Sequence, residues 1–165
     1  KNAKSLKLIC EAATGYDNID VEYCKNHGIA VCNVPGYSVY SVAQVTVSMV
    51  LSLVNHLKEY NRFVSDGTYT NGVSANILKP VYHELYGKTW GIVGYGSIGS
   101  KVGEIAKALG CNIIAYKRTP VDGVSCVDID TLVEKSDIIT VHIPLSDKTR
   151  GLISGERIAK MKKKE

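Results

Sequence analysis

The fold of this chain is decided by residues 89–99, which read TWGIVGYGSIG. The apolar run 89–93 predicts a short buried strand. Apolar residues then recur at helical spacing from Ile98 and predict a helix that ends at Gly110. A second apolar run, residues 112–116, predicts the next strand. A strand, a glycine-rich turn, a helix and a strand in this order predict a parallel βαβ unit.

The turn carries the pattern Gly-x-Gly-x-x-Gly at Gly94, Gly96 and Gly99. In this context the pattern is typical of a site for the pyrophosphate of a dinucleotide. Gly94 would allow the tight turn, Gly96 would let the backbone approach the ligand, and Gly99 would let the helix pack closely on the strand. The free N–H groups at the helix start, which include those of Ser97 and Ile98, would face the phosphates.

The same alternation continues along the chain. Leu132 and Val133 indicate a short helix, and residues 137–141 indicate a further strand. These elements predict an α/β fold with a doubly wound parallel sheet, a Rossmann-type nucleotide domain. Upstream, residues 6–10 and 29–34 predict two more strands, joined by a short helix that Asp20 caps and Gly28 ends.

Residues 41–62 predict one helix whose apolar surface is wider than a single stripe. Such a helix is buried on most sides, either within its own chain or against a partner subunit. Residues 66–86 are polar and rich in tyrosine, and they predict an ordered excursion rather than a flexible linker.

Composition excludes several classes of protein. The chain has 165 residues, 45% of them hydrophobic, and a formal net charge of +4. We expect no nucleic-acid partner, since no basic stripe with interleaved aromatic residues occurs. The nearly uncharged stretch 41–55 is too short to span a bilayer, so we expect no membrane role. The five cysteines form no Cys-x-x-Cys pair, which predicts neither a metal site nor a disulfide framework. Cys10, Cys32 and Cys111 lie in or next to apolar runs, as small core residues of a cytoplasmic protein would.

The residues after the second strand bear on the choice of cofactor. An acidic side chain about 20 residues beyond the glycine motif would bind the ribose 2′-hydroxyl of NAD. This chain has Lys117, Arg118 and Thr119 there, which suit a 2′-phosphate. NADP is therefore favoured over NAD. The alternative is that these are surface charges of a protein that uses NAD.

Four further segments resemble one family, the D-isomer-specific 2-hydroxyacid dehydrogenases. They are ATGYDNID at 13–20, NVPGYS at 33–38 with SVAQVT at 41–46, GKT at 87–89, and VHIPLS at 141–146. Their order and spacing agree with the family over nearly the whole chain. The resemblance implies that residues 1–36 are the end of a smaller, flavodoxin-like substrate domain and that residues 37–165 are a partial dinucleotide-binding domain. It also implies hydride transfer between NAD(P)H and a small 2-oxo or 2-hydroxy acid of the glyoxylate, hydroxypyruvate, glycerate or lactate type.

The resemblance also implies roles for individual residues. The backbone N–H groups of Thr14 and Gly15 would hold the substrate carboxylate. The segment 38–86 would form the interface of a homodimer. The cofactor would be bound by the crossing helix, the glycine turn and the ends of the strands, at Thr46, Gly94, Gly96, Ser97, Ile98, Gly99, Lys117, Arg118, Thr119, His142, Ile143, Pro144 and Thr149.

Two positions depart from the family. Gln44 stands where the family usually has Glu, and Lys117 where its NAD-using members have Asp. The catalytic Arg, Glu and His of the family follow the Met161–Lys162 segment, so we expect them beyond Glu165. Both ends of the chain look cut, and we expect the 165 residues alone to bind dinucleotide poorly and to be inactive. The alternative is a non-catalytic, dinucleotide-sensing regulator of the same fold.

Overall fold

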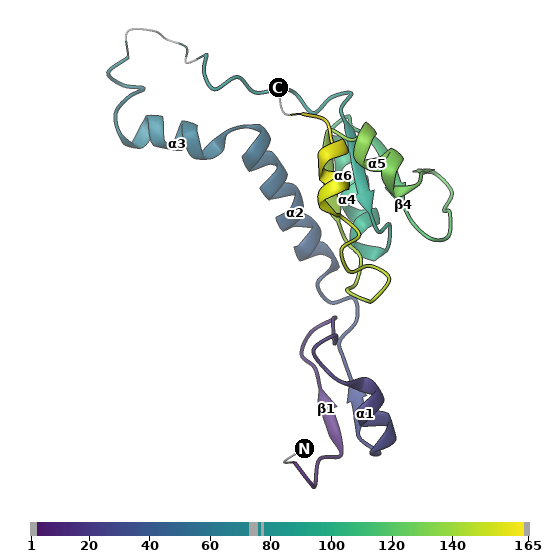
Figure 1. The fold of residues 1–165 in the computed structure, drawn as a ribbon. Helices are drawn as coiled ribbons and strands as arrows, with labels where there is room; N and C mark the ends of the chain where they lie inside the picture. The colour runs from purple at the N-terminus through teal and green to yellow at the C-terminus, as the bar shows by residue number, and fades with distance from the viewer. Residues whose placement is uncertain (1–2, 73–75, 77, 164–165) are drawn as a thin grey trace.

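The computed structural model describes residues 3–72, 76 and 78–163. At the N-terminal end lies a small unit of β1 (Leu8–Cys10), α1 (Val21–Asn26) and β2 (Ala30–Cys32), shown at the bottom of Figure 1. The two strands are parallel. Asp20 caps α1, since its side chain accepts the Tyr23 N–H at 2.8 Å. The predicted strand–helix–strand order of this unit is confirmed, with shorter strands than predicted.

The prediction of one helix over 41–62 is wrong. The structure has two helices, α2 (Val39–Val54) and α3 (Leu57–Ser65), whose axes are bent by 64° (Figure 1). The break is at His56, which has a left-handed backbone with φ of 49° and whose N–H bonds the Leu53 carbonyl instead of continuing the α-helical pattern. The apolar periodicity runs across the break from Leu53 to Leu57, so the hydrophobic pattern gave no sign of it.

The larger unit is a four-stranded parallel sheet with helices on both faces. Its strands are β3 (Thr89–Val93), β4 (Asn112–Tyr116), β5 (Ser125–Cys126) and β6 (Ile138–Val141), in the order β5-β4-β3-β6. The helices are α4 (Ser97–Ala108), α5 (Ile129–Lys135) and α6 (Gly155–Lys160). The predicted doubly wound α/β fold is confirmed. The two-residue β5 was not predicted, because two residues carry no periodicity.

Each face of this sheet has its own core. On the α4 side, Trp90 and Ile92 pack with Val102 and with Ala43 and Val47 of α2. On the α5 side the buried core consists of Val93, Ile129, Leu132 and Val133. The sheet is therefore covered on both faces, as parallel sheets are.

Helix α2 is not buried on most sides within its own chain, so only the predicted alternative of burial against a partner subunit remains, as a prediction. Only Ala43 and Val47 are buried along it, while Val45, Met49 and Leu53 are exposed, Leu53 to 75%. One face packs on α4 and the apolar stripe beside it faces outward. Within the described residues no single helix is long and apolar enough to cross a membrane, and only the bent pair α2–α3 meets that test, by length and composition.

The cysteines follow the prediction only in part. Cys111 is buried as expected, and so is Cys24 of α1, but Cys10 and Cys32 are exposed. Both sit at the ends of the two-stranded sheet of the small unit, where three-residue strands bury little surface. All five thiols are free.

Candidate dinucleotide site

The candidate site lies where the sheet changes direction. From β3 the chain passes through α4 to β4 and then to β5, and it returns to β6 on the other side of β3. All four strands are parallel, so their carboxyl ends meet at one edge. Ligands of doubly wound folds bind in the crevice at such a switch point. The segments 94–99, 117–119 and 142–144, which sequence analysis selected, all follow strands that end at this edge.

Gly94 and Gly99 are required by packing. Gly94 has a φ of 96°, and a Cβ there would lie 2.6 Å from Ile143 Cγ2 and 2.8 Å from the His142 carbonyl oxygen. A Cβ on Gly99 would collide with the Gly94 carbonyl oxygen and lie 3.1 Å from Ile92 Cγ2. The expected tight turn at Gly94 and close helix packing at Gly99 are therefore seen. In addition, Gly94 makes room for the chain that leaves β6.

Gly96 has a different environment. A Cβ at this position would meet nothing within 4 Å, so the protein itself does not demand a glycine here. Gly96 is the N-cap of α4 and provides no side-chain cap; its carbonyl accepts the Ser100 N–H at 2.8 Å. The first turn of α4, with Ser97, Ile98 and Gly99, thus presents N–H groups and the positive end of the helix dipole to open space. This arrangement fits a pyrophosphate.

Lys117, Arg118 and Thr119 lie beside this turn. Tyr116 and Val93 are the last residues of β4 and β3 and are register partners. The Tyr116 carbonyl accepts the Gly94 N–H at 2.9 Å. Lys117 is half-buried, whereas Arg118 and Thr119 are exposed. Two cations and a hydroxyl therefore follow the end of β4, next to the glycine turn.

His142 follows β6, on the other side of the glycine turn from Lys117. Its N–H continues the β6 ladder by donating to the Val93 carbonyl at 2.7 Å. Its ring atom Nε2 is buried and has no hydrogen-bond partner among the described residues. Burial lowers the pKa of the imidazole below its ordinary 6.5, which keeps the ring neutral at pH 7. A buried polar atom without a partner is uncommon, and a ligand in the crevice would supply one.

Pro144 and Thr149 belong to the loop that follows. The Thr149 hydroxyl donates to the Pro144 carbonyl at 2.7 Å and accepts the Ser146 N–H at 2.8 Å. In this structure Thr149 therefore holds the loop in shape, while Pro144 is exposed at its start.

Thr46 is half-buried on α2, the helix that packs against α4. Its hydroxyl donates to the Val42 carbonyl at 2.8 Å, one turn back on its own helix. This bond uses the hydroxyl hydrogen and leaves both lone pairs of the oxygen available to a ligand.

Thr14 and Gly15 belong to the small unit. The Thr14 carbonyl accepts the Asn33 side-chain amide at 2.8 Å, and the Thr14 hydroxyl donates to the Val34 carbonyl at 3.2 Å. The backbone N–H groups of Thr14 and Gly15 have no partner within the part of the chain that the structure describes. No hydrogen bond or ion pair among those residues joins this loop to the glycine turn. The structure thus forms two separate candidate sites.

Sequence analysis missed three residues that shape the sites. Gly91 lies within β3, where a Cβ would collide with Ser136 Oγ and with Leu132 of α5. Tyr95, between the first two motif glycines, packs its ring over Gly103, and burial raises the pKa of its hydroxyl. Asn33 holds the Thr14 loop. The glycines at positions 91 and 103, in the middle of elements, were the available signals for the first two.

The contacts of Arg157 are structural. It donates to the Leu152 carbonyl at 2.8 Å and pairs with Asp130 at 3.2 Å. Hydrogen bonds from Lys160 and then Arg157 lower the pKa of Asp130. These contacts join α6 to α5. Within the described residues no group of His, Cys, Asp or Glu is arranged to hold a metal ion.

Comparison with known proteins identifies the family. The model of the D-isomer-specific 2-hydroxyacid dehydrogenase NAD-binding domain matches residues 47–165, and that of the catalytic domain of the same family matches residues 1–88. The chain belongs to the D-isomer-specific 2-hydroxyacid dehydrogenase family. Its Rossmann-type fold and its NAD-binding domain follow from this membership.

Individual relatives agree. The chain is 41% identical to a hydroxypyruvate reductase of Thermotoga maritima, over 96% of this chain and 51% of that protein. It superimposes on a D-lactate dehydrogenase of Aquifex aeolicus complexed with NAD and lactic acid, with a TM-score of 0.85, 35% identity, and coverage of 95% of this chain and 47% of the other. An acyclic imino acid reductase in complex with NADPH and D-Arg gives a TM-score of 0.85 at 32% identity, over 94% and 50% of the two chains. The chain spans about half the length of the hydroxypyruvate reductases that it matches.

Proposed function

We propose that this chain is the central part of a longer NAD(P)-dependent D-2-hydroxyacid dehydrogenase. The enzyme transfers hydride between NAD(P)H and a small 2-oxo or 2-hydroxy acid. The observation that carries the proposal is the uncapped start of α4 at the switch point of the sheet, with open space in front of Gly96. We assign residues 1–36 to the substrate domain and 37–165 to the dinucleotide domain. Five free cysteines are in keeping with a cytoplasmic location.

Each candidate residue has a role in this proposal. The first turn of α4 binds the pyrophosphate through its N–H groups. His142, Ile143 and Pro144 line the side of the crevice along the ribose and nicotinamide, with Thr149 fixing their loop and Thr46 approaching from α2. The dinucleotide, when bound, supplies the hydride. Ile143, packed behind Gly94, helps to exclude water from the reacting end.

The substrate acid is proposed to bind at the small unit. The free N–H groups of Thr14 and Gly15 hold its carboxylate, in a loop that Asn33 keeps in place. The Arg, Glu and His that polarise the carbonyl and donate the proton are expected beyond Glu165. Without these groups, the 165 residues alone are expected to show no turnover.

The activity is tested with the full-length protein. Reduction of hydroxypyruvate, glyoxylate and pyruvate is followed by loss of the reduced nicotinamide absorbance. We expect turnover with at least one of these acids, and loss of turnover when the chain is cut after Glu165. Tight dinucleotide binding without turnover of any 2-oxo acid contradicts the enzyme proposal and supports the regulator of the same fold.

We infer that NADP is preferred over NAD. The half-buried Lys117 and the exposed Arg118 and Thr119 support this inference, because two cations and a hydroxyl suit a 2′-phosphate. A charged hydrogen bond of this kind contributes about 1.5–3 kcal/mol. Lys117→Asp is therefore expected to lower kcat/KM for NADPH by about 10- to 100-fold while that for NADH holds or rises. Lys135→Asp, an exposed change on α5, is the matched control. Equal kcat/KM for both cofactors in the unmodified enzyme refutes the preference.

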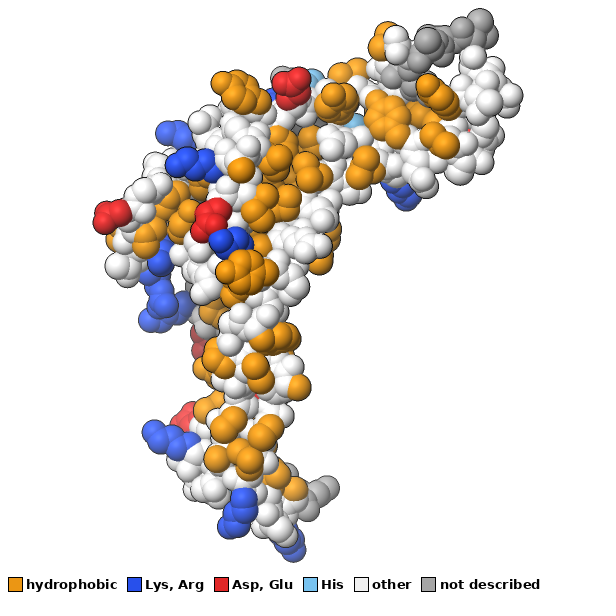
Figure 2. All heavy atoms as spheres, turned by 180° about the vertical axis from the view of Figure 1, so that it is seen from behind, with side chains coloured by type: hydrophobic (Ala, Val, Ile, Leu, Met, Phe, Trp, Pro, Cys, Tyr) orange, Lys and Arg blue, Asp and Glu red, His pale blue; other side chains and the backbone are white. Residues whose placement is uncertain are grey.

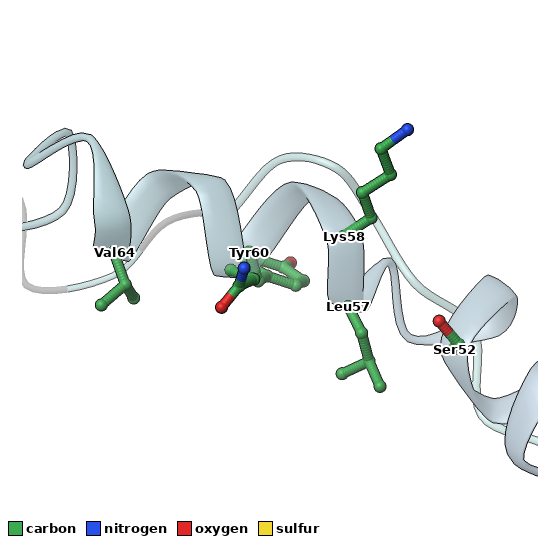
Figure 3. A pocket seen from close by; sticks show the side chains of 6 residues that line it. Ser52, Leu57, Lys58, Tyr60 and Val64 are labelled. Atoms are coloured by element: carbon green, nitrogen blue, oxygen red, sulfur yellow. The ribbon is translucent and has the colours of Figure 1, made fainter.

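We also propose a homodimer formed through α2 and α3. Val45, Met49 and Leu53 are exposed in a stripe along α2, and Figure 2 shows hydrophobic side chains along both helices. The stripe leads to an open hollow of about 580 Å³. Figure 3 shows Leu57 and Val64 pointing to one side of α3 there, with Lys58 directed away. A patch of this kind marks an interface.

The dimer is tested by sedimentation velocity. A charge in the centre of the stripe, Leu53→Asp, is expected to convert the dimer to a monomer, since a buried unpaired charge costs several kcal/mol. Lys107→Asp on the exposed side of α4 should leave the dimer intact. A monomeric full-length protein at micromolar concentration contradicts the proposal.

A further inference from the structure

The glycine turn carries one side chain between its first two glycines. Tyr95 lies between Gly94 and Gly96 and is partly buried. Its side chain packs against the core on the α4 side of the sheet, which includes Trp90 and Ile92. The glycines on both sides have no side chain of their own, so the Tyr95 ring is what joins this part of the turn to the core.

The Tyr95 ring lies over Gly103 in the second turn of α4. A Cβ on Gly103 would lie 2.9 Å from Tyr95 Cε2, 2.9 Å from the Tyr95 hydroxyl oxygen and 3.2 Å from Ile92 Cδ1. Glycine in the middle of a helix is less favourable than alanine, so α4 itself does not require a glycine here. Gly103 is buried, and the Tyr95 ring occupies the space beside it that a larger residue would need.

The tip of the Tyr95 side chain lies away from the phosphate-facing end of α4. Burial raises the pKa of its hydroxyl above the ordinary 10.0, and the nearby Glu104 carboxylate and Cys126 thiol raise it further. The hydroxyl therefore stays neutral at pH 7. Gly103 and Glu104 belong to the second turn of α4, one turn beyond the N–H groups that would face the phosphates. Tyr95 thus affects the site through packing and not through contact with a ligand.

The two glycines beside Tyr95 differ in how they are held. Gly94 is fixed by close packing, since a Cβ there would lie 2.6 Å from Ile143 Cγ2. At Gly96 a Cβ would meet nothing within 4 Å, and glycine has wide backbone freedom. The Gly96 carbonyl accepts the Ser100 N–H at 2.8 Å, so a shift of Gly96 also shifts the first turn of α4. The adjacent side chain that limits such a shift is that of Tyr95.

We propose that Tyr95 is a positioning residue of the dinucleotide site. Its ring, packed on Gly103, fixes Gly96 and thereby the direction of the first N–H groups of α4, which would bind the pyrophosphate. Without the ring, binding has to order this part of the turn as well. Ordering the backbone of one residue weakens binding roughly 5- to 30-fold. The step from turn geometry to affinity rests on the proposed function, whereas the packing of Tyr95 on Gly103 does not.

The role of the ring is tested in the full-length protein by titration with NADPH and, in parallel, with NADH. Tyr95→Ala should raise the Kd, and with it the KM for the cofactor, roughly 5- to 30-fold, with kcat at saturating cofactor unchanged. Tyr95→Phe should restore most of the affinity. The matched control is Ile105→Ala, which removes a partly buried side chain from the same core and should lower the urea midpoint without raising the Kd. A Kd in Tyr95→Ala no higher than that in Ile105→Ala overturns the proposal.

Gly103→Ala tests the packing without removing the ring. The new methyl displaces the ring, so the Kd should rise and the urea midpoint should fall. In the Tyr95→Ala background the same change should leave the Kd unaltered and raise the midpoint, because alanine favours a helix more than glycine does. Additive effects of the two changes on the Kd contradict the proposal. If the unmodified protein binds neither cofactor, the proposed function and the positioning role both fail, while the urea midpoints still decide whether Tyr95 packs on Gly103.

Discussion

The two units of this chain bury their strands to very different extents. In the larger unit, Trp90, Ile92 and Val93 of the central strand are 0% exposed, with helices on both faces of the sheet. In the small unit, the outer residues of both strands are exposed and Cys24 is the buried hydrophobic residue. Parallel strands need cover on both faces. The larger unit therefore has a core of its own, while the small unit exposes apolar residues such as Leu8.

The same difference holds for the two candidate sites. The glycine turn is set by rigid packing: Gly94 and Gly99 are forced by atoms that a Cβ would strike. The Thr14 loop is set by hydrogen bonds between two partly exposed segments, 11–14 and 32–34. We infer that the proposed dinucleotide site is preformed and that the proposed carboxylate site responds more readily to changes in its surroundings.

The largest expected effect tests the difference in cores. Trp90→Ala removes a fully buried side chain and its hydrogen bond to Thr140 at 3.1 Å. It should lower the free energy of unfolding of the larger unit by about 3–5 kcal/mol. Leu8→Ala, at a residue that is 49% exposed, should cost under about 1 kcal/mol. Urea unfolding of the 165-residue chain, followed by far-ultraviolet circular dichroism, measures both. Similar losses from the two variants would break the comparison.

The second prediction separates folding from binding within the glycine turn. In Gly99→Ala the new methyl collides with the Gly94 backbone, so we expect a loss of about 1–3 kcal/mol in stability together with loss of dinucleotide binding. In Gly96→Ala the methyl meets no protein atom within 4 Å, so stability should fall by less than about 1 kcal/mol while binding is lost.

The readouts for this pair are urea midpoints and titration of the full-length protein with NADPH. Normal NADPH affinity in Gly96→Ala would show that the space in front of α4 is not the phosphate site. Unchanged stability in Gly99→Ala would show that the helix start can move away from β3, against the rigid packing inferred above.

The core of the larger unit could be predicted from the sequence, because its strands and helices repeat apolar residues at the spacing that each element requires. The βαβ order and the glycine turn correctly placed residues 94–99 at a strand end, and Asp20 was correctly predicted as a cap. Elements that are buried against several neighbours repeat apolar residues most regularly, so the predictions of strands and helices succeeded where burial is greatest.

The sequence did not predict features that depend on backbone geometry or on which residues pack over a side chain. The break at His56 depends on one left-handed residue inside a continuous apolar pattern. Cys10 and Cys32 lie in apolar runs, but nothing among the described residues packs over them closely enough to bury them. The hydrogen bond from Asn33 to Thr14 joins residues 19 positions apart, and no local pattern encodes such a contact. The partner-free Nε2 of His142 likewise depends on tertiary burial.

A third prediction tests the hydrogen-bonded loop. Asn33→Ala removes the amide that donates to the Thr14 carbonyl at 2.8 Å. A bond of this kind contributes about 0.5–1.5 kcal/mol, so amide exchange in residues 11–15 should accelerate by roughly two- to tenfold while exchange in β3 stays unchanged. Hydrogen-exchange mass spectrometry measures both segments in one experiment. Accelerated exchange in β3 as well would mean that the two units are coupled more tightly than their separate packing suggests.

The smallest expected effect concerns His142, which follows β6. Its buried Nε2 has no hydrogen-bond partner among the described residues. Burial lowers the pKa of His142 below 6.5 in the folded chain, so the unfolded chain binds more protons as the pH falls. The stability tied to the neutral ring is therefore complete above pH 6.5 and declines as the pH drops through and below that value. The side chain is only partly buried, so solvent reduces the effect.

His142→Gln should flatten the pH dependence of the urea midpoint across this range. Bound NADPH should steepen it in the unmodified full-length protein if the cofactor contacts the neutral ring, and an unchanged slope would place His142 outside the cofactor's reach.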